Sequence, residues 1–222
     1  MNLADLQRWL NEHGAITIGV DGKYGPATRN ALLAAFSNLS APAITSDQID
    51  GIAERLGCTR KQVMAVAKVE SGGSAYDDFG RPKILFERHY FHRLTQGKWS
   101  VCAYSNGTAG GYGESSWQKL ADAAGKDPDA AFQSASWGRF QIMGSHWKAL
   151  GYLDEMEMPW AMREGEYGHY EALCRYVETF GLVKAIRALS TDPEACRAFA
   201  KGYNGPGYAR FDYHTKLAKA MR

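Results

Sequence analysis

Short amphipathic segments with helical spacing, separated by capping and turn residues, most strongly limit the folds open to this chain. Within residues 49–56 the apolar residues occupy positions i, i+3, i+4 and i+7, and Gly57 follows as a stop. Thr59 and Gln62 then have the spacing of a capping box for a following helix. No series of segments alternates apolar and polar residues as half-buried strands do. The sequence therefore predicts a mainly α fold.

The same kind of pattern continues through the rest of the chain. Residues 83–86 predict a short extended segment, and residues 99–112 a small hairpin. Asp192-Pro193 is a good helix start, because proline is tolerated in the first turn. Further helices are predicted near residues 114–124, 128–134, 144–150, 164–180, 182–189, 193–201 and 212–221.

Length and composition place the chain among soluble globular proteins. It has 222 residues, of which 45% are hydrophobic and 23% charged, so it is not a disordered chain. Its 26 basic and 24 acidic residues leave a net charge of +2, which argues against nucleic acid as a partner. No run approaches about 18 consecutive apolar residues, so we expect no membrane insertion. The first residues, MNLADLQRWLNEHG, lack the pattern of a secretory signal peptide.

Cysteine and histidine spacing predicts neither a metal site nor a cofactor. The chain has four widely spaced cysteines, Cys58, Cys102, Cys174 and Cys196. Because none belongs to a C-x-x-C pair, they are interpreted as reduced thiols rather than as zinc ligands or a disulfide scaffold. His89 and His92 have H-x-x-H spacing, but H-E-x-x-H is absent and no third ligand accompanies them.

Residues 1–40 are predicted to form a small unit of their own. Two short helices joined by a loop rich in turn dipeptides, DGKYGP, are expected within residues 3–36. Residues 41–46 are small, polar and proline-containing and predict a linker, which leaves residues 47–222 as the larger domain. A unit of about 40 residues can barely hold its own core, so it must be very compact or lean on its neighbour.

One carboxylate falls on the apolar face of a predicted helix. Val63, Val66 and Ala67 form the apolar stripe of this helix, and Glu70 shares the stripe at helical spacing. Burial of a carboxyl group raises its pKa and keeps it protonated near neutral pH. Such a group can donate a proton to a leaving oxygen, as the general acid of a glycosidase does. The alternative is a structural glutamate at a helix end, paired with an arginine or with backbone.

Residues 134–147, SASWGRFQIMGSHW, predict a tight turn that leads into a helix. Gly138 would let the backbone approach a ligand closely, and Ser136 belongs to the same turn. Gln141 offers a donor and an acceptor for an acetamido group or a sugar hydroxyl. Trp137 is the best candidate for stacking on a sugar face, with a position in the core as the alternative.

Residues 199–208, FAKGYNGPGY, predict a helix that ends at Gly202 and a turn after it. The turn presents Tyr203 and Asn204, whose hydroxyl and amide groups suit the wall of a polar cleft. We therefore expect both residues to bind substrate.

Taken in order, these motifs resemble a known family of cell-wall enzymes. V-E-S-G-G, G-R-P-K-I-L-F-E-R-H, S-A-S-W-G-R-F-Q-I-M-G and F-A-K-G-Y-N-G-P look like the phage endolysin N-acetylmuramidases, over about residues 45–222. The shorter set E-S-G, S-x-G-x-x-Q and Y-N-G is similar to goose-type lysozymes and soluble lytic transglycosylases. Near the N-terminus, L-Q-x-x-L-N-x-x-G followed by V-D-G-K-Y-G-P-A-T resembles the bacterial peptidoglycan-binding helical module, over about residues 3–36.

The resemblance implies a fold, a reaction and a set of site residues. The fold would be an α-rich lysozyme-like domain with a cleft, preceded by the small helical module. The reaction would be hydrolysis of the β-1,4 bond between N-acetylmuramic acid and N-acetylglucosamine, with Glu70 as the catalytic acid. The loop of the N-terminal module corresponds to Asp21, Gly22, Tyr24 and Gly25.

A second catalytic carboxylate is expected in ILFERHYFHR, at Glu87. It would activate water or stabilise an oxocarbenium-like transition state. The alternative is a structural salt bridge to Arg81 or Arg88. Asp77 and Asp78 are weaker candidates for holding the water.

The sequence thus predicts an endolysin, a monomer whose partner is peptidoglycan. Such an enzyme would wait in the host cytoplasm and reach the periplasmic wall once the membrane is permeabilised, by analogy in a Gram-negative host. One alternative is a lytic transglycosylase, which leaves a 1,6-anhydro sugar. Another, from a different class, is a non-catalytic wall-binding or virion structural protein, which would bind peptidoglycan without cutting it.

Overall fold

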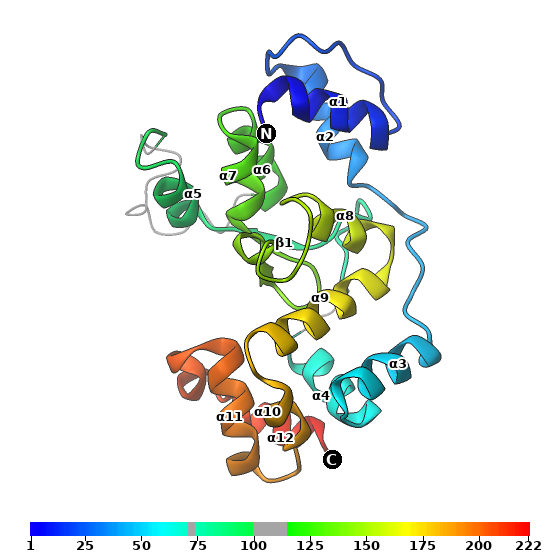
Figure 1. Ribbon diagram of the computed structural model, residues 1–222, viewed down its shortest axis with the longest axis vertical. Coiled ribbons are helices and arrows are strands. Elements are labelled where there is room, and N and C mark those ends of the chain that lie inside the picture. Colours follow the sequence, from blue (N-terminus) through cyan, green and yellow to red (C-terminus); the bar gives the residue numbers. More distant parts are fainter. Residues whose placement is uncertain (71–73, 100–114) are drawn as a thin grey trace.

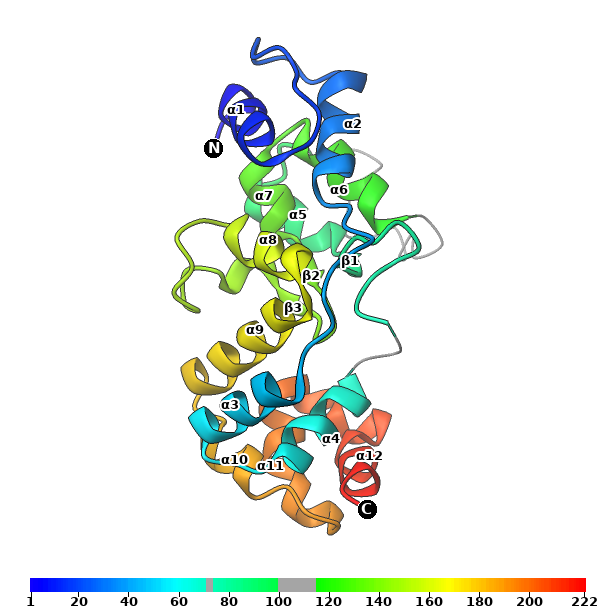
Figure 2. The ribbon, with the colours of Figure 1, turned by 90° about the vertical axis from the view of Figure 1, so that its right-hand side faces the viewer.

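This computed structural model describes residues 1–70, 74–99 and 115–222. The molecule is elongated, with α1 and α2 at one end, α10–α12 at the other, and α9 running between them (Figures 1 and 2). Its α-helices are α1 (Leu3–His13), α2 (Pro26–Ala35), α3 (Ser46–Leu56), α4 (Arg60–Glu70), α5 (Arg88–Leu94), α6 (Ser116–Ala124), α7 (Pro128–Gln133), α8 (Glu157–Glu164), α9 (Glu166–Thr179), α10 (Val183–Arg187), α11 (Pro193–Asn204) and α12 (Tyr213–Ala220). Its other elements are the strands β1 (Ile84–Phe86), β2 (Ala135–Trp137) and β3 (Ile142–Met143) and the 3-10 helices η1 (Gly144–His146) and η2 (Pro206–Phe211).

The prediction of a mainly α fold is confirmed, although several elements differ from their predicted bounds. The helix predicted over residues 144–150 is reduced to η1, and α5 and α8 were not predicted. Pro159 makes α8 hard to recognise in the sequence, yet it lies in the first turn, where its missing N–H is not needed. The hairpin predicted over residues 99–112 falls almost wholly outside the described residues.

A three-stranded antiparallel sheet in the order β1-β2-β3 lies at the middle of the molecule (Figure 2). Ile84 pairs with Trp137, and Trp137 pairs in turn with Ile142. Residues 135–143 therefore form a hairpin. The predicted tight turn is present at residues 138–141, but it leads into β3 and not into a helix. The chain reverses because Gly138 and Gln141 both adopt a positive φ, of 68° and 49°. Strand β1 confirms the extended segment predicted over residues 83–86.

The N-terminal helices share one hydrophobic core with the rest of the chain. Phe36, at the end of α2, is 0% exposed. Its ring lies 5.4 Å from that of Trp117 and 5.6 Å from that of Phe132, both in the following part of the chain. Trp9 on α1 meets Trp160 on α8 edge to face at 5.1 Å. The unit predicted at residues 1–40 therefore leans on its neighbour.

Polar contacts also join α2 and the loop before it to α6. The Tyr24 hydroxyl donates to the carbonyl oxygen of Ala121. Arg29 pairs with Asp122 at 3.0 Å. A Cβ at Gly125 would overlap the Tyr24 ring, so this glycine permits the close approach.

Most of the linker predicted at residues 41–46 belongs to a strap, here defined as residues 38–45, that runs along α8 and α9. The side-chain amide of Asn38 donates to Arg163 O at 3.0 Å. Pro42 O accepts from the N–H of Glu166 at 2.9 Å, and the Ile44 N–H donates to the Glu166 carboxylate at 3.0 Å. These bonds hold the segment in place along its length, which a free spacer would not require.

One buried carboxyl group makes the stability of this fold sensitive to pH. Glu155 lies just before α8, and burial together with the neighbouring Asp129 raises its pKa from 4.5 to about 7. Between these two values the folded chain retains a proton that the unfolded chain releases, so stability falls as the pH rises through 7. We expect Glu155→Gln to increase the free energy of unfolding by about 1–3 kcal/mol at pH 8 and to change it little at pH 4.5.

Urea denaturation of both proteins at both pH values measures this effect. Glu12→Gln, at an exposed position of α1, is the matched control and should change stability at neither pH. An equal effect of Glu155→Gln at pH 8 and pH 4.5 would contradict the prediction.

Candidate active site

Glu70 is the last residue of α4, a helix whose start and buried face follow directly from its sequence. The capping box is confirmed, because Thr59 N donates to the Gln62 side chain at 2.8 Å and Gln62 N donates to Thr59 Oγ1 at 3.2 Å. Val63 and Val66 are buried, and α4 packs on α3 and α12. Glu70 extends this buried face to the helix end, where it is half-buried.

The surroundings of Glu70 favour its protonated form. Burial raises the pKa of the carboxyl group. A hydrogen bond from the Asn204 amide, 3.1 Å from Glu70 Oε1, and the positive charge of Lys216 act in the opposite direction without cancelling the effect. Glu70 therefore lies on the buried face of α4, as predicted, and its pKa is raised by burial.

Asn204 reaches Glu70 because α11 is longer than predicted. The helix continues through Gly202 and ends at Asn204, and Gly205 follows with a φ of 74°. Gly202 does not stop the helix; a Cβ there would overlap the side chain of Leu182, so packing explains the glycine. Asn204 thus acts from a helix end and not from the predicted turn.

Tyr203 joins α11 to the hairpin. Its hydroxyl donates to Phe140 O at 2.8 Å. Burial and the nearby Glu70 carboxylate raise the pKa of the Tyr203 phenol well above its usual value, so the phenol remains neutral. This bond makes Tyr203 a support of the cleft wall.

Hydrogen bonds within the hairpin fix the orientation of its own polar side chains. Ser136 Oγ donates to Gln141 Oε1 at 2.8 Å, and Gln141 Nε2 donates to Gly138 O at 2.8 Å. A Cβ at Gly138 would overlap His169, so this glycine serves packing as well as the turn. Gln141 is exposed, and its amide is held in one orientation by bonds within the hairpin.

Glu70 and the hairpin line one cleft of about 280 Å³. Sequence reasoning missed two basic residues on this cleft, Lys83 and Arg139, although both lie within the motifs G-R-P-K-I and S-W-G-R-F. Arg139 is held by an ion pair with Glu166 at 2.6 Å. The lining residues are Glu70, Ser74, Lys83, Ile84, Gly138, Arg139 and Gln141.

His169 also fixes the Arg139 backbone behind the cleft. The Arg139 N–H donates to His169 Nδ1 at 3.0 Å. Burial lowers the pKa of His169 to about 4, so the ring is neutral and can accept this bond. The hairpin is therefore anchored to α9 from its inner side.

Trp137 does not lie on the cleft, so its predicted role in stacking on sugar is wrong. The residue is 0% exposed, and its ring stacks on Phe132 at 5.6 Å. Its indole N–H donates to Phe132 O at 3.0 Å. In β2 it faces the core, and Ile84 and Ile142 are its partners on the neighbouring strands.

Glu87 is not among the residues that line the cleft. It precedes α5, and its carboxylate lies 3.4 Å from His89 Nδ1. Arg81, one of its expected partners, pairs instead with Asp77 at 2.7 Å. Asp77 also accepts from backbone N–H groups of its own turn, which is a structural role, and Asp78 is exposed.

In the N-terminal loop, a buried glutamine organises the predicted binding residues. The Gln7 amide donates to Asp21 Oδ1 at 2.9 Å and accepts from the Gly22 N–H at 2.8 Å. The bond from Gln7 and a further one from the Lys23 N–H lower the pKa of the Asp21 carboxyl. Asp21, Gly22 and Gly25 lie on this loop, whereas Tyr24 contacts α6. The order provided by Gln7 was not recognised from the sequence.

The described residues contain no group of three or more His, Cys, Asp and Glu side chains that could hold a metal ion. In the same ranges, no helix has both the length and the apolar character needed to cross a bilayer. Cys58, Cys174 and Cys196 are free thiols, and Cys102 lies outside the described residues.

Replacing Asn204 with alanine tests the electrostatics of the cleft. Loss of the amide donor removes a bond that favours the Glu70 carboxylate, so the pKa of Glu70 should rise. An acid that must be protonated then stays active to higher pH, and the alkaline limb of kcat/KM should move upward. Asn30→Ala, at an exposed position of α2, is the control. An alkaline limb that stays in place or moves downward would contradict this prediction.

Comparison with known proteins shows which family this chain resembles in sequence and structure. A model of the N-acetylmuramidase family matches residues 59–222, which include α4, the hairpin and α11. Among solved structures, the crystal structure of the Burkholderia AP3 phage endolysin is similar, with a TM-score of 0.70 and 32% sequence identity. That match covers 99% of this chain and 92% of the other, so it includes the N-terminal helices. A search of curated proteins found no match.

Proposed function

This chain belongs to the N-acetylmuramidase family, and from that premise we propose that it is an endolysin that cuts peptidoglycan glycan strands. The bond hydrolysed would be the β-1,4 bond between N-acetylmuramic acid and N-acetylglucosamine. The observation that carries the proposal is the carboxyl group of Glu70, whose pKa is raised by burial and which lines a cleft together with polar groups.

In this proposal Glu70 donates its proton to the glycosidic oxygen as the bond from that oxygen to the anomeric carbon breaks. The sugar left behind develops positive charge at its anomeric carbon. A water molecule, or the acetamido group of the substrate followed by water, then completes hydrolysis. Glu87 remains a proposed second catalytic group, although its placement outside the cleft lining makes substrate assistance the simpler route.

Polar groups beside Glu70 would position the sugar. The exposed amide of Gln141 is oriented by Ser136 and by Gly138 O, so it meets a sugar acetamido group or hydroxyl without further ordering. Asn204 keeps the Glu70 carboxylate in place, and Tyr203 holds the wall behind it. Interactions of this kind contribute most when the donors are already fixed before substrate arrives.

Mass spectrometry of the fragments released from purified peptidoglycan tests the reaction. After borohydride reduction, we expect reduced N-acetylmuramic acid at the new ends. Fragments lighter by one water, without a reducible end, would identify a lytic transglycosylase instead. Reduced N-acetylglucosamine ends would identify a glucosaminidase, and intact glycan would leave only a wall-binding or virion structural role.

The N-terminal helices would hold the enzyme on its polymeric substrate. Their loop, ordered by Gln7, exposes Asp21 and Gly22, and attachment would raise the effective concentration of glycan at the cleft. Tyr24 would contribute indirectly, by docking the loop on α6. The enzyme would act as a monomer on the periplasmic wall, after waiting in the host cytoplasm for the membrane to be permeabilised.

A further inference from the structure

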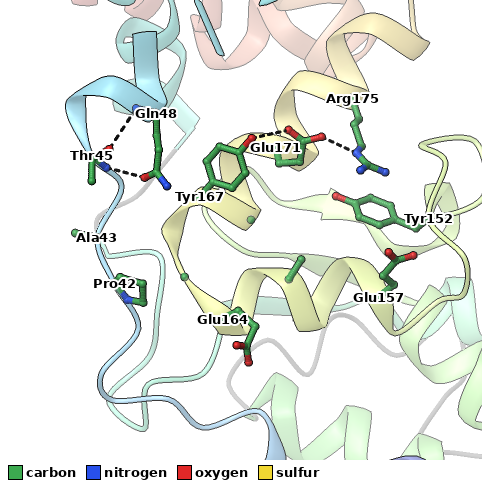
Figure 3. A pocket seen from close by; sticks show the side chains of 13 residues that line it. Pro42, Ala43, Thr45, Gln48, Tyr152, Glu157, Glu164, Tyr167, Glu171 and Arg175 are labelled. Carbon is green, nitrogen blue, oxygen red and sulfur yellow. Dashed lines mark hydrogen bonds and ion pairs between the residues drawn. The ribbon is translucent and has the colours of Figure 1, made fainter. Parts of the chain in front are cut away.

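A second cavity, of about 480 Å³, lies between the strap, α8 and α9, on the part of the molecule shown in Figure 3. It shares no lining residue with the Glu70 cleft. Its size falls within the range of about 300–1,000 Å³ that is usual for small-ligand sites. Nothing in the proposed glycan reaction uses it.

The charged side chains that line this pocket are mostly acidic. Glu171 is compensated, because Arg175 lies 2.8 Å and Arg55 3.0 Å from its carboxylate. Glu164 has an ion pair with Arg163 at 2.6 Å. Glu157 accepts a hydrogen bond from the Leu153 N–H, and within the described residues it has no ion pair. The pocket therefore holds one carboxylate that forms no ion pair with the described residues.

A buried hydroxyl group points into the same space. Tyr152 is 6% exposed, and its hydroxyl has no hydrogen-bond partner in the described part of the chain. Figure 3 shows this hydroxyl directed across the pocket toward Tyr167, while the Arg175 guanidinium lies over the ring at 4.4 Å. A buried hydroxyl left unpaired is unfavourable, so a ligand that pairs with it is favoured.

The remaining walls suit a short apolar chain that carries a cation. Pro42, Ala43 and Ala161 present apolar surface. The ring of Tyr167 is half-exposed and offers a face to a cation. Burial raises the pKa of the Tyr152 phenol, so its oxygen stays neutral and can accept a bond from an ammonium N–H.

We infer that this pocket binds a primary ammonium group at the end of a short aliphatic chain, paired with Glu157 and Tyr152. In peptidoglycan this chemistry belongs to the free amine of the diamino acid in an uncrosslinked stem peptide. That choice of source rests on the proposed function, whereas the ammonium chemistry rests on the pocket alone. The pocket then gives the enzyme a contact with the peptide part of the wall, separate from its glycan cleft.

An NMR titration of the full chain with acetyl-L-Ala-γ-D-Glu-L-Lys tests the inference. This probe has no sugar, and its lysine side chain carries its only amine. We expect a dissociation constant in the millimolar range, weakened about tenfold when that amine is acetylated. Glu157→Gln keeps the acceptor for Leu153 N–H but removes the charge, and should also weaken binding about tenfold.

Two further variants localise the effect. Tyr152→Phe should weaken binding severalfold, and Glu194→Gln, at an exposed glutamate of α11, should leave it unchanged. Absence of binding, equal binding of the acetylated peptide, or wild-type affinity in a folded Glu157→Gln protein would each overturn the inference.

The source of the amine is decided by a parallel titration. The same peptide with meso-diaminopimelate in place of lysine carries the ammonium beside a carboxylate. Tighter binding of either peptide supports the ammonium site and identifies the kind of wall that it fits. Because neither peptide contains a glycosidic bond, failure of glycan hydrolysis would not affect this result, and failure here would not affect the glycosidase proposal.

Discussion

Replacing Glu70 with glutamine is expected to lower kcat for peptidoglycan hydrolysis by about 10³-fold, because a positioned general acid typically contributes about 10²–10⁴-fold. Glutamine has nearly the same shape and can accept the hydrogen bond from Asn204, so the α4 helix end should be unchanged. It cannot transfer a proton to the leaving oxygen. Release of new reducing ends from purified peptidoglycan measures the loss.

Two other glutamates serve as comparisons for this result. Glu54→Gln, at an exposed position of the neighbouring α3, should retain full activity. Glu87→Gln should cost less than about tenfold if water or the acetamido group completes the reaction, and a loss as large as that of Glu70→Gln would restore Glu87 as the second catalytic carboxylate. Full activity in a folded Glu70→Gln protein would remove Glu70 from the mechanism.

Replacing Phe36 with alanine is expected to lower the free energy of unfolding of the whole chain by about 4 kcal/mol, the usual cost of emptying a fully buried phenylalanine site. The ring contacts Trp117 and Phe132 as well as Trp9 on its own side of the core. The cavity would therefore lie between the N-terminal helices and the catalytic part. Urea denaturation followed by circular dichroism and by residual hydrolytic activity measures the effect.

The two signals should fall together in one transition, since the core is shared. Leu39→Ala, in the strap and 83% exposed, is a matched apolar truncation that should change stability little. If Phe36→Ala instead melted the N-terminal helices first and left hydrolysis intact, these helices would be an independent module.

Much of the fold could be predicted because local signals agreed with the packing. The spacing in residues 49–56 and the Thr59–Gln62 capping box gave α3 and α4 close to their observed bounds. Residues 134–147 were misinterpreted because backbone conformation, not side-chain pattern, decides the hairpin: Gln141 adopts a positive φ that its residue type rarely takes. In α11, Gly202 was interpreted as a helix end. The sequence does not show the tertiary contact with Leu182 that explains a glycine at this position.

A site residue could be predicted where the periodicity of a helix fixed its position. Glu70 could be predicted because the spacing of apolar residues in α4 places it on the buried face of that helix. Trp137 was misplaced because sequence does not tell which face of a short strand meets the core. Lys83 and Arg139 were passed over because a charged residue near a motif is common, and only the fold brings both to one cleft.

The strap has a consequence for how such an enzyme can diversify. Glu166 binds Arg139 of the cleft and Ile44 of the strap with the two oxygens of one carboxylate. A gene fusion that exchanged the N-terminal helices at this segment would remove one of these partners and take Phe36 out of the core. Exchange of the N-terminal helices alone is therefore expected to destabilise the rest of the fold. By contrast, substitutions at the exposed residues 15–17 of the preceding loop are expected to leave these shared contacts intact.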